Sequence, residues 1–332
     1  MNVTTRAKIT GWGHYLPEKI VTNFDLEKMM NTTNEWIVQR SGIEQRHYAA
    51  DNETPSDMAL HASHKAMAMA GITADEIDII IFATLSPEYY FPGSGVLLQD
   101  KLGISPRAAI DIRNQCSGFL YGLDAADAYI RSQKYKAALL IGGEVHSRFI
   151  DYSDEGRHVA VLFGDAAAAM VIQASDEPGI MDTVLYSQGE HAHELMLESP
   201  GSASNPGFDP SMFEEKKCYP QMNGKFVFKN AIKRLAQVTH DICEKCGTSI
   251  DDIDLFLYHQ ANLRINQMVA RELKIPPEKC FNNIQNVGNT SAASVPLAFS
   301  QAAEQNLIQP GSKILMASFG SGFTWGAGIV KI

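Results

Sequence analysis

The residues around Cys116 have the pattern of an activated nucleophile. An apolar run at 108–112 (AAIDI) predicts a strand, residues 113–115 form a polar turn, and an Ala-rich amphipathic segment at 119–131 predicts a helix. This order places the Cys116 sulfur at a helix N-terminus, where the dipole and the free N–H groups favour a thiolate and lower the cysteine pKa. The same N–H groups are suited to hold a thioester oxyanion. Taken alone, the segment also fits a buried structural cysteine.

Two more polar side chains follow apolar runs in the second half of the chain. His259 comes directly after the run at 253–258 (IDLFLY), and Asn289 lies in the segment 286–293 (NVGNTSAA). Each has an ordinary alternative, because a lone histidine is commonly a hydrogen-bonded core residue and an asparagine commonly caps the next helix.

An internal repeat, with an offset of roughly 175 residues, relates these segments to the cysteine turn. Three segments of the first half correspond, in order, to three of the second: 75–82 to 251–258, 98–104 to 270–275, and 136–143 to 313–320. We therefore predict two α/β halves, 1–175 with the nucleophile and 176–332 with the histidine and the asparagine. Equivalent strand ends of two packed halves meet, so Cys116, His259 and Asn289 are predicted to share one site.

The strands and helices of this α/β fold alternate along the chain. Short runs rich in Ile, Leu and Val alternate with longer Ala-rich segments such as 58–70 and 119–131. Continuous apolar strands are buried on both faces, which implies helix layers on both sides of each sheet.

The segment 187–223 is polar, rich in Gly, Pro and Ser, and has no clear period. A loop of this length predicts a lid, a binding loop or an interface element.

Composition excludes several classes of protein. The 332 residues carry a formal charge of −10, from 38 acidic and 28 basic residues, which disfavours nucleic acid as a partner. The five cysteines are an odd number and scattered, which suits a reducing cytosol rather than a disulfide framework. The segment 1–6 has no apolar run of a signal peptide, and the apolar stretch at 159–172 is too short to span a bilayer. We expect a soluble, cytoplasmic protein without membrane contact.

The motifs resemble those of the β-ketoacyl-acyl-carrier-protein synthase III family, in the thiolase superfamily. The segments that carry the resemblance are 33–37 (TNEWI), 40–43 (RSGI), 163–167 (FGDAA), 259–265 (HQANLRI), 288–296 (GNTSAASVP) and 323–327 (FTWGA). The resemblance covers essentially the whole chain. The resemblance implies a thiolase-like duplicated fold of five layers, αβαβα.

The resemblance also implies a decarboxylative Claisen condensation. Cys116 would take the acyl group of an acyl-CoA, and a malonyl thioester on acyl carrier protein or on CoA would then lose CO2 and attack the acyl-enzyme. His259 and Asn289 would donate hydrogen bonds to the malonyl thioester oxygen, and the backbone N–H groups of Cys116 and Ser321 would form the oxyanion hole. Ping-pong kinetics follow from such a covalent intermediate. No metal or redox cofactor is expected.

Further positions match the family less directly. The expected CoA-binding residues are Trp36, Arg40, Arg157, Gly224, Phe228, Ala261 and Asn262. Residues Lys225, Lys229, Arg264 and Arg271 are expected to dock an acidic carrier protein, although Lys233, which continues the same spacing, fits a plain solvated helix face equally well. The residues expected at the acyl pocket are Tyr89, Tyr90 and Phe91, where a partner subunit would close the pocket, so a homodimer is expected.

Some positions separate branches of the superfamily. Asn289 favours the priming synthases over the elongating ones, which have histidine there. The glycine loop at 318–322 (SFGSG) lacks the second cysteine of thiolases. The segment 113–115 (RNQ), Ser321 and the long 187–223 loop depart from common priming synthases. They resemble a divergent branch with the quinolone-signal condensing enzyme and synthases that prime with longer acyl chains, so the starter is left open.

Other functions and sites remain as alternatives. Cys, His and Asn also form the triad of cysteine hydrolases. The same nucleophile would serve an acyltransferase that passes its acyl group to an alcohol or amine. The complete triad disfavours a non-catalytic partner subunit. The pair Cys243 and Cys246, with His240 upstream, resembles half of a zinc site but lacks a second pair, and we interpret it as structural. The segment 190–194 (EHAHE) is weaker still as a metal site.

Overall fold

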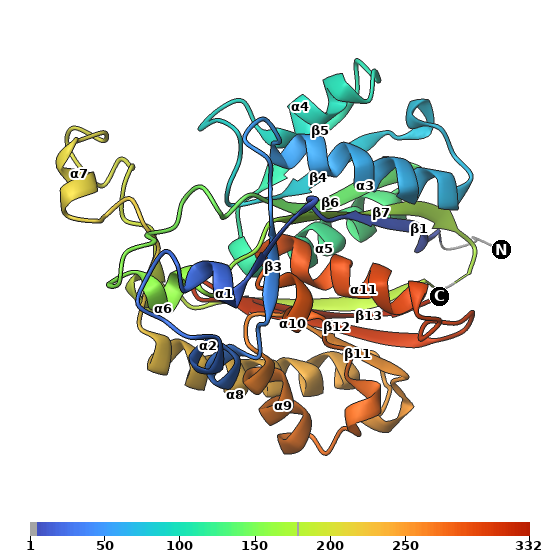
Figure 1. The fold of residues 1–332 in the computed structure, drawn as a ribbon. Helices are drawn as coiled ribbons and strands as arrows, with labels where there is room; N and C mark the ends of the chain where they lie inside the picture. Colours follow the sequence, from blue (N-terminus) through green and yellow to red (C-terminus); the bar gives the residue numbers. More distant parts are fainter. Residues whose placement is uncertain (1–4, 178) are drawn as a thin grey trace.

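Two β-sheets, one from each half of the chain, carry the fold (Figure 1). The computed structural model describes residues 5–177 and 179–332. Residues 1–4, on which the expected absence of a signal peptide partly rests, lie outside the described residues. The first sheet has the order β1-β7-β6-β4-β5, with β1 Arg6–Tyr15, β7 Ala166–Ser175, β6 Ala137–Glu144, β4 Ile79–Ala83 and β5 Ala108–Ile112. The second has the order β11-β12-β13-β8, with β11 Leu255–Tyr258, β12 Lys313–Gly320, β13 Thr324–Lys331 and β8 Ile180–Ser187.

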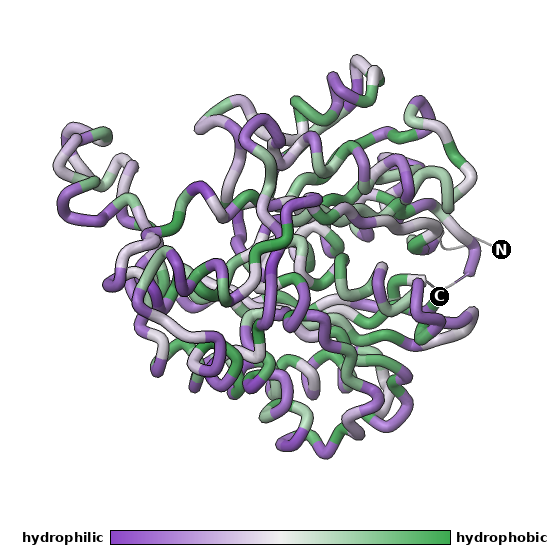
Figure 2. The backbone as a smooth tube through the Cα atoms, in the orientation of Figure 1, coloured by the Kyte–Doolittle hydropathy of each residue, from purple (hydrophilic) through white to green (hydrophobic). Residues whose placement is uncertain are grey.

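Helices cover both sheets and fill the space between them. On the outer face of the first sheet lie α3 Pro55–Ala70 and α4 Ser94–Lys101, and on the outer face of the second lie α8 Gly224–Lys245 and α9 Leu263–Glu272. Between the sheets lie α5 Gly118–Arg131 and α11 Ser294–Glu304. Their apolar side chains, Phe119 and Phe299 among them, form one buried cluster with residues of both sheets. Figure 2 shows the hydrophobic segments concentrated in these layers. The five-layer αβαβα arrangement is confirmed.

The predicted elements have clear local causes. Strands β4, β6 and β11 are buried along their whole length, as their unbroken apolar runs indicate. Helix α3 begins at a capping box in which Thr54 and Asp57 exchange hydrogen bonds, has Pro55 in its first turn, and ends at Gly71 with φ 68°. The predicted strand at 108–112 has the bounds of β5.

The repeat is visible in matching hydrogen bonds. In the first half the Asp78 carboxylate accepts the backbone N–H groups of Lys136 and Ala137, at 2.7 and 3.1 Å. In the second half the Asp254 carboxylate accepts the backbone N–H of Lys313, at 2.8 Å. Each aspartate precedes one parallel strand and ties it to the start of its neighbour. The segments matched in the sequence therefore have the same structural role in both halves.

Shorter elements connect the strands and helices at both ends of the sheets. They are β2 Lys19–Thr22, α1 Asn23–Leu26, α2 Asn34–Ser41, β3 Gln45–Tyr48, α6 Arg157–Ala160, α10 Ile284–Val287 and the one-turn helices η1 Ala74–Glu76, η2 Gln115–Ser117, η4 Ile250–Asp252, η5 Pro277–Lys279 and η6 Ser291–Ala293. No helix in the described residues is both long and apolar enough to cross a membrane.

The segment after β8 forms an arm that projects from the layers (left in Figure 1). It contains η3 Gly189–Glu194, β9 Leu195–Met196, α7 Ser211–Glu214 and β10 Gln221–Met222, and β9 pairs with β10 to close its base. Lys216 fixes the arm to the body through ion pairs with Asp151 (3.1 Å) and Glu155 (2.6 Å). The long loop expected at 187–223 is thus an ordered arm with short elements of its own.

Candidate active site

Cys116 lies in the one-turn helix η2, between the end of β5 and the start of α5. The second half of the chain packs directly against it. The Ser318 hydroxyl donates to the Cys116 carbonyl oxygen at 2.6 Å. A Cβ added to Gly320 would lie 2.7 Å from the Cys116 Cβ and 3.2 Å from its sulfur, so only glycine fits there. The end of β12 therefore forms one wall of the site.

The electrostatics of the thiol differ from the expectation. Burial raises the pKa of the Cys116 thiol to about 11, a Ser291 hydroxyl that donates to its sulfur at 3.5 Å opposes this, and the charge of Glu144 adds to the rise. The predicted lowering of the cysteine pKa by the helix N-terminus is wrong for the free chain, because desolvation of a thiolate outweighs the local dipole. Cys116 is nevertheless half-buried rather than sealed in the core.

His259 follows β11 and its imidazole is buried. Its backbone N–H donates to Ala317 at 2.8 Å, and the next residue, Gln260, donates its N–H to the Ser294 hydroxyl at 2.7 Å. Both ring nitrogens lack a hydrogen-bond partner among the described residues. Burial lowers the pKa of His259 to about 3, so the ring is neutral at physiological pH and keeps one N–H to donate.

Asn289 lies in the turn between α10 and η6. Its backbone is held on both sides, since its N–H donates to Leu162 at 2.8 Å and its carbonyl accepts the Gly164 N–H at 3.0 Å. Its side-chain oxygen accepts the Ser291 N–H at 2.9 Å. Because the oxygen is occupied, the NH2 group is the part of this amide that is left to donate to a ligand.

Hydrogen bonds between neighbouring residues link the three predicted residues. Ser291, which contacts the Cys116 sulfur, is bonded to Asn289. His259 is bonded to Ala317, whose neighbour Ser318 donates to Cys116. Ser321, expected in the oxyanion hole, follows Gly320 at the same wall, and its hydroxyl donates to the Leu195 carbonyl. The arrangement offers one sulfur nucleophile and two neutral donors.

Three residues of this site were missed by the sequence analysis. Ser291 lies 175 residues after Cys116, so the repeat offset applied to the cysteine would have found it. Glu144, at the end of β6, is fully buried, and burial raises its carboxyl pKa to about 7. His146 packs on Phe163 with ring centroids 4.5 Å apart, and burial together with nearby His259 lowers its pKa to about 3. Nothing local in the sequence marks either of the last two.

Four of the expected CoA-binding residues, Trp36, Arg40, Arg157 and Asn262, are linked by direct contacts. The guanidinium carbons of Arg40 and Arg157 lie 4.6 and 5.4 Å from the centroid of the Trp36 ring. The Asn262 side chain donates to the Arg40 carbonyl at 2.9 Å, which joins α9 to α2. Gly224 is the first residue of α8, Phe228 lies one turn further, and Ala261 lies between His259 and the N-cap of α9.

The expected docking residues lie beside this surface. Lys225, Lys229, Arg264 and Arg271 are all exposed and form no ion pair among the described residues. The expected acyl-pocket residues Tyr89, Tyr90 and Phe91 lie between β4 and α4, and 60%, 70% and 80% of their surfaces are exposed. Within one chain they therefore enclose no pocket.

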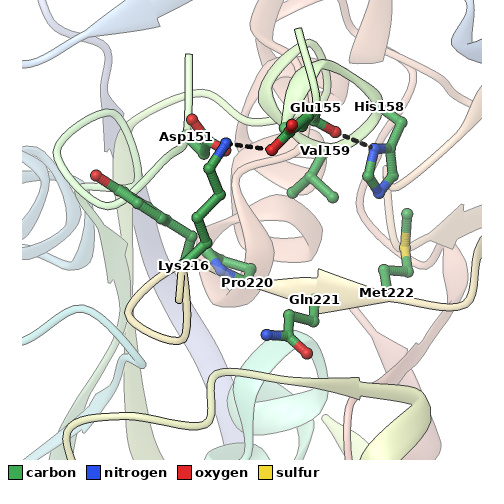
Figure 3. Close-up of a pocket in the computed structure, with 10 residues that line it drawn as sticks. Asp151, Glu155, His158, Val159, Lys216, Pro220, Gln221 and Met222 are labelled. Carbon is green, nitrogen blue, oxygen red and sulfur yellow. Dashed lines mark hydrogen bonds and ion pairs between the residues drawn. The ribbon is translucent and has the colours of Figure 1, made fainter. Parts of the chain in front are cut away.

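A cavity of about 300 Å³ lies between the arm and α6 (Figure 3). Its lining includes Asp151 and Glu155, which face Lys216 of the arm, and the apolar side chains of Val159 and Met222. It adjoins Arg157, so it borders the expected CoA-binding surface.

The weak metal motifs have ordinary structural surroundings. Cys243 is buried on α8 in the core beneath the second sheet. His191 packs between Phe226 and Phe323, with ring centroids 4.9 and 5.3 Å away. In the described part of the chain no group of three or more His, Cys, Asp or Glu side chains is arranged to hold a metal ion.

Comparisons with known proteins show the family of the chain. Residues 110–189 match the family described as 3-oxoacyl-[acyl-carrier-protein] synthase III, and residues 243–332 match its C-terminal domain. A β-ketoacyl-[acyl-carrier-protein] synthase III of Thioalkalivibrio sulfidiphilus is 42% identical over 98% of this chain and 99% of that protein.

Solved structures give the same result. The 3-oxoacyl-[acyl-carrier-protein] synthase III of Aquifex aeolicus superposes with a TM-score of 0.90 and 40% identity, over 98% of this chain and 100% of that one. The enzyme of Thermus thermophilus has a TM-score of 0.90 and 35% identity, over 98% and 99%. The chain is an acyl-transferring condensing enzyme and belongs to the β-ketoacyl-[acyl-carrier-protein] synthase III family.

Proposed function

We propose that the chain condenses a Cys116-bound acyl group, taken from an acyl-CoA, with a malonyl thioester carried by acyl carrier protein or CoA. The Cys116 sulfur attacks the acyl-CoA carbonyl, the carbonyl–sulfur bond of the thioester breaks, and CoA leaves as its thiol. The malonyl C–C bond then breaks to release CO2, and the resulting carbanion attacks the acyl carbonyl. The Cys116–acyl bond breaks and a β-ketoacyl thioester leaves.

The observation that carries this proposal is a pair of neutral donors, His259 and Asn289, in the turns that are linked to Cys116. Decarboxylation places negative charge on the malonyl thioester oxygen. The free NH2 of Asn289 and the single N–H of neutral His259 are suited to stabilise that charge. Preorganised donors of this kind each contribute about 3–4 kcal/mol to the rate. The backbone N–H groups of Cys116 and Ser321 are proposed to hold the oxyanion of the acyl-transfer steps.

The rival cysteine hydrolase has less support. Such an enzyme uses its histidine as a base on the sulfur. The hydrogen-bond partner of the Cys116 sulfur is the Ser291 hydroxyl, whereas both His259 nitrogens are unpartnered in the described residues. Acyl transfer to an alcohol or amine stays an alternative that the experiment below separates.

Substrate entry is proposed on the surface around Trp36. Two guanidinium groups on one indole ring provide stacking and positive charge for the nucleotide of CoA. The remaining expected residues, Gly224, Phe228, Ala261 and Asn262, would line the path from there toward His259. Lys225, Lys229, Arg264 and Arg271 would dock the acidic carrier protein, despite the overall charge of −10.

A homodimer is proposed to complete the acyl pocket. Strand β5 is the edge of the first sheet and leads to Cys116, and an open edge favours pairing with another chain. The exposed aromatic residues Tyr89, Tyr90 and Phe91 follow β4, the strand that pairs with β5. A second copy that covers them would bring apolar surface to the site.

The divergent priming branch, the absence of a cofactor and a cytoplasmic location remain predictions. The five free cysteines suit a reducing compartment.

The test combines mass spectrometry with CO2 release. Exposure to a panel of acyl-CoA thioesters should add one acyl group to the intact protein, Cys116→Ala should carry none, and Cys246→Ala, a matched control, should load normally. Malonyl thioester should then yield one CO2 and one β-ketoacyl product per acyl group. Asn289→Ala should keep the adduct and lose about 10²–10³-fold in CO2 release. Release of free acid or an acyl ester without CO2 would overturn condensation.

A further inference from the structure

Ser291 occupies an unusual position beside the nucleophile. Its hydroxyl donates to the Cys116 sulfur at 3.5 Å, an ordinary length for a bond to sulfur. Its backbone has φ 47°, in the left-handed region that a non-glycine residue adopts at a cost. Its backbone N–H is held by the Asn289 side chain at 2.9 Å. Such a conformation persists only where the surroundings determine it.

Glu144 supplies a large part of those surroundings. Its buried carboxylate accepts five donor groups, which are the Thr84 hydroxyl, the backbone N–H and hydroxyl of Ser86, and the backbone N–H groups of Leu85 and Ala292. The Ala292 contact, at 3.4 Å, ties the turn of the second half to strand ends of the first. Gly142 allows the close approach, since a Cβ there would lie 2.3 Å from the Ala292 carbonyl oxygen.

We propose that Ser291 is a further catalytic residue, whose hydroxyl stabilises the Cys116 thiolate as it forms and attacks, and that Glu144 is a positioning residue that fixes the turn carrying Ser291. In the acyl-transfer step the thiol proton passes to solvent, the sulfur bonds to the acyl carbon, and the departing CoA thiolate takes a proton from solvent. The Ser291 proton stays on its oxygen throughout. The role belongs to the thiol itself and is independent of which acyl group is loaded.

The two residues act on the thiol with opposite electrostatic signs. A hydroxyl donor favours the thiolate, so Ser291 lowers the Cys116 pKa, whereas the Glu144 charge raises it. Removing the Glu144 charge would alone make the thiol more reactive. Loss of the Ser291 hydrogen bond through a displaced turn would make it less reactive. The direction of the change therefore distinguishes positioning from plain charge repulsion.

The experiment follows alkylation of Cys116 by iodoacetamide at about pH 8, measured by peptide mass spectrometry without any acyl substrate. Ser291→Ala and Ser291→Gly should each slow it about three- to tenfold, since the thiolate fraction falls and the rise in nucleophilicity offsets only part of that loss. Glycine accepts the positive φ, so Ser291→Gly should keep the wild-type melting temperature. Ser63→Ala, which removes another buried hydroxyl on α3, should react at the wild-type rate. Wild-type rates in both Ser291 variants would overturn the proposal.

Glu144→Gln tests the positioning role. Slower alkylation supports it, and the effect should be less than additive with Ser291→Ala. Faster alkylation would overturn it, because only charge removal would then remain. If Glu144→Gln does not fold, Ser86→Ala removes one donor to the same carboxylate and should give a smaller change in the same direction. If the wild-type enzyme does not load from acyl-CoA but the Ser291 variants are alkylated more slowly, the proposed substrates are wrong and this inference stands.

Discussion

The guanidinium carbon of Arg264 lies 5.6 Å from the centroid of the Phe228 ring, which joins α9 to the part of α8 that carries Lys225 and Lys229. The neighbouring residue pair Asn262 and Arg40 links the same point to the Trp36 stack. The residues proposed to dock the carrier protein and those proposed to bind the nucleotide are therefore linked by direct contacts. A carrier protein docked there would place its prosthetic arm near the entrance proposed for CoA.

Reversal of charge on this surface should weaken carrier docking alone. Lys229→Glu and Arg264→Glu should each raise KM for malonyl-acyl-carrier protein about five- to tenfold, because a like-charge contact replaces an attractive one. The kcat and the KM for a malonyl-CoA substitute should stay unchanged, and the KM difference should shrink at high salt. Lys19→Glu, on β2, is the matched control and should leave KM unaltered. An unchanged KM in the Arg264 variant would remove the docking role.

Loss of the indole ring should weaken the use of CoA thioesters specifically. Trp36→Ala removes the platform for two guanidinium groups and should raise KM for acyl-CoA about tenfold, the size of one lost stacking contact. Loading from the N-acetylcysteamine thioester of the same acyl group, which has no nucleotide, should proceed at the wild-type rate. Equal losses with both thioesters would show that Trp36 supports the fold of the site and not the nucleotide.

Much of the fold could be predicted because the internal repeat and the unbroken apolar runs indicate the strands directly. The run at 108–112 has the bounds of β5. The matched segments at 75–82 and 251–258 lead into β4 and β11, and an aspartate directly precedes each strand. Buried parallel strands need apolar residues on both faces, so the signal is strong. The position of Cys116 before a helix followed from the same logic.

The rest depends on tertiary contacts that no local pattern reports. The pKa of Cys116 was predicted in the wrong direction because the local helix N-terminus is visible in the sequence and the burial by β12 is not. The Glu144 carboxylate, which accepts the Ala292 N–H next to the left-handed Ser291, lies 147 residues before Ser291 in the sequence. The arm around α7 has strands of two residues each, too short for a period to appear.

The pH dependence of the two half-reactions should differ. With the Cys116 pKa raised to about 11, the thiolate fraction grows tenfold per pH unit throughout the neutral range, so acyl loading should rise from pH 6 to 9 without a plateau at the ordinary cysteine pKa. Stopped-flow loading at a series of pH values measures this.

The decarboxylation step should respond differently to pH. The pKa of His259 is lowered to about 3, so its ring is neutral between pH 5 and 8. The rate of CO2 release by preloaded enzyme should therefore not change over this pH range. A protonated donor would lose its charge as the pH rises through 6.5, and CO2 release would fall there. That fall would contradict the neutral-donor role.

The repeated aspartates provide a matched test of stability. The Asp78 carboxylate holds two backbone N–H groups, of Lys136 and Ala137, and is partly shielded from water, whereas the exposed Asp254 holds one, of Lys313. Removing an acceptor leaves its donors to be satisfied by water, which is harder where the surroundings are less exposed.

Asp78→Ala should therefore lower the free energy of unfolding by about 1–3 kcal/mol, and Asp254→Ala by about 1 kcal/mol or less. Urea denaturation followed by circular dichroism measures both, and the exposed Asp51→Ala on a turn is the control with no expected change. The two variants lie in different sheets, so their effects should add in the double variant. A larger loss in Asp254→Ala than in Asp78→Ala would mean that strand pairing in the second sheet depends on this contact more than the number of its hydrogen bonds indicates.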